Sequence, residues 1–60
     1  RGVYLKKPIK KGEIIRRNNM IFLRPLIGTD ARLYKELDSS IALKDIKPLK
    51  AIYRDIDYKI

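Results

Sequence analysis

The sequence predicts a small single domain that is mainly β with short helical turns and has two pseudo-symmetric halves. Three observations lead to this fold class. The chain has 60 residues, which is close to the lower limit for a domain that folds alone and leaves room for one core. Its apolar segments are short and are separated by Pro and Gly, as in domains built from short strands. The segment that begins at Ile9 is also echoed by the segment that begins at Ile46.

The N-terminal third reads as two short strands joined by a turn. Residues 3–5 (VYL) are good β-formers, and Pro8 ends this strand because proline cannot donate to a ladder. Gly12 permits positive φ and marks a turn before the apolar pair at residues 14–15. Residues 18–20 (NNM) predict one capped helical turn.

A further strand is predicted at residues 21–24 (IFLR), and it ends at Pro25. A residue that precedes proline is disfavoured in the helical region, so Arg24 is expected to have an extended backbone. Gly28 marks the loop that follows.

One helix of about two turns is predicted at residues 31–37. Thr29 and Asp30 are both competent N-caps for it. Its apolar residues have helical spacing: Leu33, Tyr34 and Leu37. We expect Tyr34 and Leu37 to pack against the core rather than to contact a ligand.

The C-terminal third repeats the order of the first. Residues 41–43 (IAL) predict a strand. Ile46 is then followed six positions later by Ile52, just as Ile9 is followed six positions later by Ile15. Strand, turn, strand and capped turn therefore recur as a pseudo-symmetric pair.

The core has to be stabilised by packing alone, because the chain has no Cys and therefore no disulfide. The apolar residues expected to contribute are Ile9, Ile14, Ile15, Ile21, Phe22, Leu23, Leu33, Leu37, Ile41, Leu43, Ile46 and Ile52.

The missing residue types also restrict the chemistry. Without Cys or His there is no thiolate zinc site, no imidazole base and no His-based triad. Asp45, Asp55 and Asp57 are expected to cap turns or balance lysines rather than to bind a metal. We therefore predict no catalytic residue, no metal site and no cofactor in this domain.

Positive charge is concentrated in the first part of the chain. The net charge is +8. Residues 1–24 hold eight basic and one acidic side chain, whereas residues 25–60 hold seven basic and six acidic ones. An anionic partner is therefore expected to meet the face built by residues 1–24.

No apolar run is long enough for a signal-peptide core or a membrane helix, so we expect a cytoplasmic protein that does not contact a membrane. The chain begins at Arg1 without an initiator Met. This indicates a piece of a longer protein, which could carry chemistry that these residues lack.

Four motifs occur in a characteristic order: RGVY at residues 1–4, PIKKGE at residues 8–13, RP at residues 24–25 with Gly28, and KDIK at residues 44–47. In order and spacing, they resemble the antifreeze-like (SAF) domain that ends sialic acid synthases (N-acetylneuraminate synthases) and related nonulosonic acid synthases. The resemblance covers the whole chain. It implies that residues 1–60 are a SAF domain at the C-terminal end of a longer synthase.

The resemblance also implies a fold and a function. The fold is the β-clip, which type III antifreeze proteins share. The family's function depends on a (β/α)8 barrel, which uses a divalent metal to condense phosphoenolpyruvate with N-acetylmannosamine or a related amino sugar. The SAF domain of one protomer caps the barrel of the other in a domain-swapped dimer. An arginine that matches Arg24 reaches the acceptor sugar there. We expect the isolated domain to be a monomer.

The chain departs from the family pattern at three places. Leu26 stands where the family usually has a glycine after Arg-Pro. The glycine that commonly follows the helix is replaced by residues 38–40 (DSS), and the second Lys-Gly turn is replaced by residues 47–50 (KPLK). These changes bear on the path of the Arg24 loop and on the subfamily.

Three other functions remain open from the sequence. A SAF module of a flagellar or pilus assembly factor would follow an export signal and would lack a barrel. An ice-binding protein is disfavoured by the net charge of +8. Nucleic-acid binding is suggested by the lysine-rich run, but Tyr4 is the single aromatic residue in that run, and no helix-turn-helix, zinc-finger or RNA-recognition signature is present.

Overall fold

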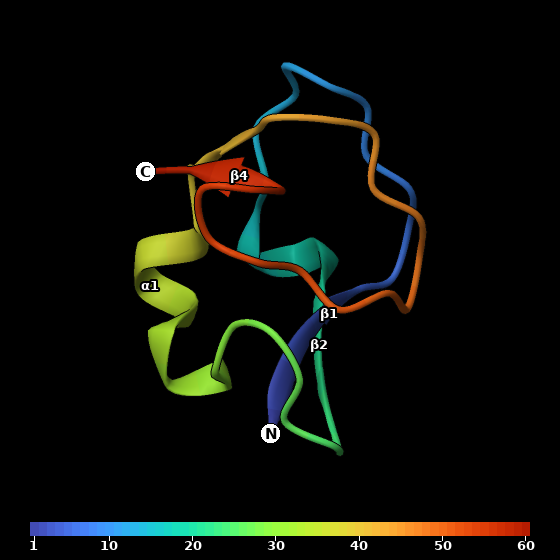
Figure 1. Cartoon of the computed structure of the whole chain (residues 1–60), viewed down its shortest axis with the longest axis vertical. Coiled ribbons are helices and arrows are strands. Elements are labelled where there is room, and N and C mark those ends of the chain that lie inside the picture. Colours follow the sequence, from blue (N-terminus) through green and yellow to red (C-terminus); the bar gives the residue numbers. More distant parts are fainter.

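The computed structural model describes all of residues 1–60. Seven elements follow one another along the chain: β1 (Gly2–Leu5), the 3₁₀ turn η1 (Arg17–Asn19), β2 (Met20–Leu23), the 3₁₀ turn η2 (Ala31–Leu33), α1 (Tyr34–Leu37), β3 (Ile41–Ala42) and β4 (Tyr58–Lys59). Figure 1 shows these elements joined by long loops that wrap around one centre. The prediction of a mainly β domain with short helical turns is confirmed.

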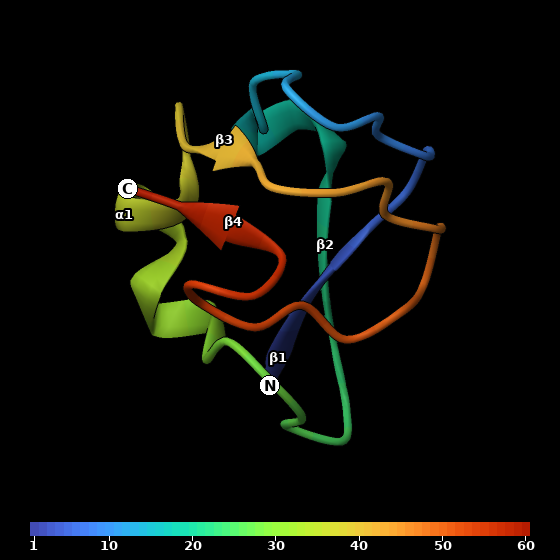
Figure 2. The ribbon, with the colours of Figure 1, turned by 45° about the horizontal axis from the view of Figure 1, so that its top comes forward.

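Two small antiparallel sheets form the framework. β1 pairs with β2, with Tyr4 opposite Ile21, and β3 pairs with β4, with Ala42 opposite Tyr58. A view from a second direction shows β3 and β4 together to the left of β2 (Figure 2). Each sheet has only two strands, so neither is stable by itself, and their shared core holds them together.

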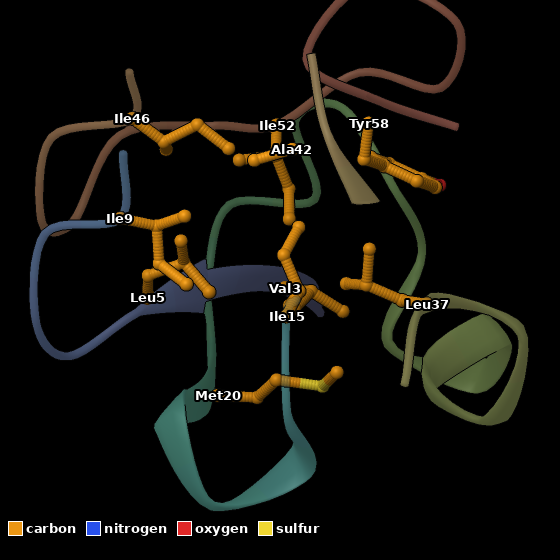
Figure 3. Packing of buried hydrophobic residues seen from close by; sticks show 10 residues of the cluster. All are labelled: Val3, Leu5, Ile9, Ile15, Met20, Leu37, Ala42, Ile46, Ile52 and Tyr58. Carbon is orange, nitrogen blue, oxygen red and sulfur yellow. The ribbon is translucent and has the colours of Figure 1, made fainter. Parts of the chain in front are cut away.

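The core is a single cluster to which both sheets, α1 and the connecting loops contribute. Its ten buried members are Val3, Leu5, Ile9, Ile15, Met20, Leu37, Ala42, Ile46, Ile52 and Tyr58. Figure 3 shows their side chains directed toward one another from both halves of the chain. Phe22, Ala31 and Tyr34 pack against the cluster from outside, so the predicted core role of Tyr34 and Leu37 is confirmed.

The two echoing segments are related in space as well as in sequence. Ile9 and Ile46 form an antiparallel bridge, in which each backbone N–H donates to the other's carbonyl at 3.0 and 2.8 Å. Beside it, the Gly12 N–H donates to the Ala42 carbonyl at 2.8 Å, and the Leu49 N–H donates to the Leu5 carbonyl at 2.9 Å. These are equivalent bonds, because Gly12 and Leu49 stand three positions after Ile9 and Ile46.

Equivalent positions also have the same burial. Ile15 and Ile52, each six positions after the residue of the bridge, are both completely buried. The pseudo-symmetry predicted from the sequence is therefore confirmed as an approximate twofold relation between the halves.

Three of the residues assigned to the core from the sequence are exposed: Ile14 by 40%, Leu33 by 44% and Ile41 by 48%. Ile14 and Ile41 pair with each other and lie directly beside Ile15 and Ala42, which are buried. Successive side chains of extended backbone point to opposite faces. At Ile14 and Ile41 the core prediction was therefore wrong because only one of each pair of neighbours can face inward. Leu33 ends η2, a turn that has no buried residue.

Other differences concern burial and boundaries. The chain buries five core residues that the sequence analysis missed: Val3, Leu5, Met20, Ala42 and Tyr58. Ile21, Phe22, Leu23 and Leu43 are only half-buried. The predicted strand at residues 14–15 is a single bridge at Ile14, the strand at residues 41–43 stops at Ala42, and β2 begins one residue earlier than predicted.

The helical turns match their predictions in part. η1 carries no side-chain cap, so the capping prediction was wrong there. At residues 31–37 the first turn is 3₁₀ and the second is α-helical, and Asp30 is the N-cap, with its carboxylate accepting from the Arg32 N–H at 2.9 Å. Asp30 is therefore confirmed as the cap in preference to Thr29.

Candidate functional site

The candidate site is the loop of residues 24–28, here called the Arg24 loop, which leads from β2 toward η2. Arg24 is exposed, and its side chain makes no hydrogen bond or ion pair within the chain. All of its guanidinium donors are therefore free to bind another molecule. In both views the loop, drawn in green, lies beside the N-terminus (Figures 1 and 2).

The start of the loop is fixed by β1. The Tyr4 hydroxyl donates a hydrogen bond to the Pro25 carbonyl at 2.8 Å. Gly2 lies so close beneath the loop that an added Cβ would be 3.0 Å from the Ile27 carbonyl oxygen and 3.4 Å from that of Pro25. The peptide bond between Arg24 and Pro25 is cis. The backbone next to Arg24 thus lies directly on the first strand.

The end of the loop is fixed by the second half of the chain. Gly28 has φ of +75°, and an added Cβ would come within 2.4 Å of the Ile52 carbonyl oxygen. That same oxygen accepts from the Thr29 N–H at 2.8 Å and from its hydroxyl at 3.0 Å. Thr29 Oγ1 also lies 2.8 Å from the Tyr58 hydroxyl. Only glycine fits at position 28, because both the backbone conformation and the close approach exclude a side chain.

The tip of the loop is apolar and open. Leu26 and Ile27 are both exposed large hydrophobic residues. Leu26 is not among the residues with positive φ, whereas Ser39 (φ 74°) and Leu49 (φ 59°) are. The loop therefore follows this path without the glycine that the family usually has at position 26. At the other two places where the chain departs from the family pattern, residues 38–40 and 47–50, Ser39 and Leu49 adopt the left-handed conformation although neither is a glycine.

Lys6 and Lys7 follow β1 at the end of the β1–β2 pair that is opposite to the Arg24 loop. The two ion pairs in the structure, Arg32 with Asp30 at 3.0 Å and Lys44 with Asp57 at 3.3 Å, involve none of the basic residues at positions 1–24. A hollow of about 360 Å³ at that end is lined by Lys6, Lys7, Pro8, Asn18 and Asn19. The unpaired positive charge can attract anions or an acidic protein surface.

The aromatic rings of Tyr4 and Phe22 both make contacts within the domain. Tyr4 is 7% exposed, so its ring cannot stack on a nucleic-acid base. The Arg17 guanidinium carbon lies 4.6 Å from the centre of the Phe22 ring and 5.5 Å from that of Tyr34. This contact is a cation–π arrangement that holds η1 against β2 and α1.

The carboxylates of Asp45 and Asp57 bind groups within the domain. No three Asp or Glu side chains lie close enough to hold a metal ion. Asp57 accepts from the Tyr53 N–H at 2.8 Å and pairs with Lys44, and Asp45 accepts from the Lys11 N–H at 2.9 Å. Asp45 and Asp57 therefore cap turns, as predicted.

Asp30 is the carboxylate whose protonation is most affected by a neighbour. The hydrogen bonds from the Arg32 side chain, at 3.0 and 3.2 Å, and then from its backbone N–H hold the pKa of Asp30 below the ordinary value of 3.8. The same side-chain contact raises the pKa of Arg32. Both effects stabilise the charged forms.

Sequence reasoning singled out Arg24 but missed the residues that hold its loop. Tyr4 and Gly2 lie about twenty positions before the loop and contact it only in the folded chain. Thr29 directly follows the loop, but its partners Ile52 and Tyr58 are far away in the sequence. Gly2 belongs to the RGVY motif, but the motif does not reveal what Gly2 contacts.

None of the helices in the structure is long and apolar enough to cross a lipid bilayer.

Comparison with known proteins shows the family of the chain. Residues 1–55 match the SAF domain family. The chain is 43% identical over 47 residues to pseudaminic acid synthases from Campylobacter jejuni subsp. jejuni serotypes O:2 and O:23/36, and the match covers 78% of this chain. It spans only 14% of the length of these curated relatives. Both are nonulosonic acid synthases, as the motifs predicted. The chain belongs to the SAF domain family.

Proposed function

We propose that this chain is the substrate-capping domain at the C-terminal end of a nonulosonic acid synthase. In this proposal, Arg24 enters the acceptor-sugar site of the partner protomer's barrel. There phosphoenolpyruvate is condensed with N-acetylmannosamine or a related amino sugar. The barrel carries out the reaction with its divalent metal, and this domain is not catalytic on its own. Because phosphoenolpyruvate is made in the cytoplasm, the proposal sets the protein there.

The proposal rests on the exposure of the Arg24 guanidinium and on its lack of partners within the chain. The Arg24 side chain is exposed and unpaired, while the backbone before Arg24 belongs to β2 and the backbone after it is held at Pro25 by Tyr4 and at Thr29 by Ile52. Surface arginines usually lose side-chain and loop entropy when they bind. Here the loop is ordered before binding, so more of the interaction energy is retained.

The chemistry of the arginine suits a sugar. A guanidinium stays charged at every physiological pH and offers five N–H donors in a planar fork. Hydroxyl and carbonyl oxygens of an amino sugar are acceptors for such donors. The pseudaminic acid synthases that match this chain support a sugar-acid product for the full-length protein.

The test is steady-state kinetics of the full-length protein with Arg24→Ala. Loss of charged hydrogen bonds predicts an acceptor-sugar KM that rises about ten- to hundredfold, or a matching fall in turnover, with the phosphoenolpyruvate KM unchanged. Arg54→Ala is the matched control, because it removes an exposed arginine without ion pairs from another loop. Unchanged acceptor kinetics in Arg24→Ala contradict the proposal.

A second check is the coding sequence upstream of Arg1. A barrel-sized αβ repeat of roughly 250 residues there agrees with the synthase. A signal peptide without such a repeat favours an exported assembly module instead.

A further inference from the structure

We infer that the Tyr4 hydroxyl is a positioning group for Arg24, an inference that rests on the function proposed above. Tyr4 does not touch the substrate in this account. It acts through the backbone of Pro25, the residue that follows Arg24, and so determines where the guanidinium is presented.

Tyr4 is a buried residue of β1 that lies outside the core cluster. Val3 and Leu5 are completely buried members of the core cluster, whereas Tyr4 is 7% exposed and is not a member. Side chains alternate along a strand, so Tyr4 faces away from the core shared by Val3 and Leu5. On that side it meets Pro25.

The hydrogen bond uses the one backbone polar group that Pro25 has. Proline has no N–H, so its carbonyl is its sole backbone hydrogen-bonding group. The Tyr4 hydroxyl donates to it at 2.8 Å, across 21 positions of the sequence. No other hydrogen bond from a different element reaches residues 24–27.

The rest of the loop is held independently of Tyr4. Thr29 binds Ile52 and Tyr58 at the far end, and Gly2 packs below Ile27. Tyr4→Phe keeps the ring and these contacts, and it removes the bond beside Arg24. The substitution should therefore leave the fold in place and widen the range of positions that Arg24 samples.

The experiment is a double-mutant cycle in the full-length protein with Tyr4→Phe, Arg24→Ala and both together, measured as the turnover and as the KM of the acceptor sugar and of phosphoenolpyruvate. We expect Tyr4→Phe to raise the acceptor KM about three- to tenfold with the phosphoenolpyruvate KM unchanged. In the Arg24→Ala background it should add nothing, because a positioning group has no effect once the group it positions is gone. Tyr34→Phe is the matched control, since the Tyr34 hydroxyl makes no hydrogen bond.

The outcomes separate the two proposals. If Arg24→Ala leaves both the acceptor KM and the turnover unchanged, the proposed function fails. If Arg24→Ala raises the acceptor KM or lowers the turnover but Tyr4→Phe does neither, or if the two effects multiply independently, Arg24 keeps its role and the positioning role of Tyr4 is overturned. A melting temperature for each variant distinguishes a shift in KM from a loss of fold.

Discussion

Gly28, in the Arg24 loop, is constrained both by its backbone conformation and by its close approach to the Ile52 backbone, and Gly12, in the first turn of the chain, provides a comparison. Gly28 and Gly12 both have positive φ, of +75° and +89°. They differ in their surroundings, because a Cβ at position 28 would meet the Ile52 backbone and a Cβ at position 12 would meet nothing within 4 Å. Substitution of Gly12 therefore measures the destabilisation caused by the left-handed conformation alone, whereas substitution of Gly28 adds the effect of the steric clash.

Gly28→Ala is predicted to destabilise the chain much more than Gly12→Ala. Left-handed backbone alone costs alanine about 1 kcal/mol, which is the expected effect at position 12. At position 28 the contact at 2.4 Å with a carbonyl oxygen forces the loop away from Ile52, and the expected loss is about 3 kcal/mol or more. Chemical denaturation of the two variants measures the difference, and equal losses would refute the close-approach argument.

At the scale of elements, the connections between short segments are closed by local hydrogen bonds from side chains. Asp30 caps η2 just after the Arg24 loop. Asp57 accepts from the Tyr53 N–H in the second half, and Asp45 accepts from the Lys11 N–H in the turn beside Gly12. Elements this short cannot be stable by themselves, so capping and the shared core determine where each begins and ends.

The Asp30 cap predicts a defined pH dependence. Its pKa in the folded chain lies below the ordinary 3.8 because of Arg32. A lowered folded pKa contributes stability that is present above pH 3.8 and is lost as the pH falls through the folded pKa. We expect the Asp30 carboxyl, followed by NMR, to titrate below 3.8 in the native chain and closer to 3.8 in Arg32→Ala. Arg54→Ala should leave the midpoint unchanged, and a native midpoint at or above 3.8 would rule out this arrangement.

At the scale of the whole molecule, two similar halves share one core. The bridge between Ile9 and Ile46 lies where the halves meet, and Ile15 and Ile52 occupy equivalent buried positions. The Arg24 loop belongs to the first half but is tied to the second through Ile52. Its geometry therefore depends on the packing of both halves.

Substitutions at equivalent core positions should lower the free energy of unfolding by similar amounts. Ile15→Val and Ile52→Val are each predicted to lower the free energy of unfolding by about 0.5–1.5 kcal/mol. The same change at the exposed Ile56 is predicted to stay within about 0.5 kcal/mol of zero. Urea denaturation tests this, and a loss at Ile52 no larger than that at Ile56 would contradict the shared core.

The sequence predicted those features that depend on neighbouring residues. The two helical turns at residues 31–37 and the positive φ at Gly12 follow from local patterns, and the echo between Ile9 and Ile46 follows from the repetition of such a pattern. The structure has each of them. The prediction was wrong for Ile14 and Ile41, because an apolar pair in a two-stranded sheet does not reveal which member faces inward.

The contacts that hold the site could not be predicted in the same way. Arg24 was identified through its Arg-Pro motif. The bond from Tyr4 to Pro25 and the contact of Gly28 with Ile52 join segments far apart in the sequence. Such contacts depend on the register of β1 on β2 and on the docking of the two halves, and neither has a local signature.

The most direct test of the central claim is a crystal structure of the full-length protein with phosphoenolpyruvate and the acceptor amino sugar bound. The account predicts that the Arg24 guanidinium lies within hydrogen-bonding distance of the acceptor sugar in the partner protomer's barrel, with the bond from Tyr4 to Pro25 intact. An Arg24 side chain that faces solvent in that complex, with the sugar bound by barrel residues alone, would contradict it.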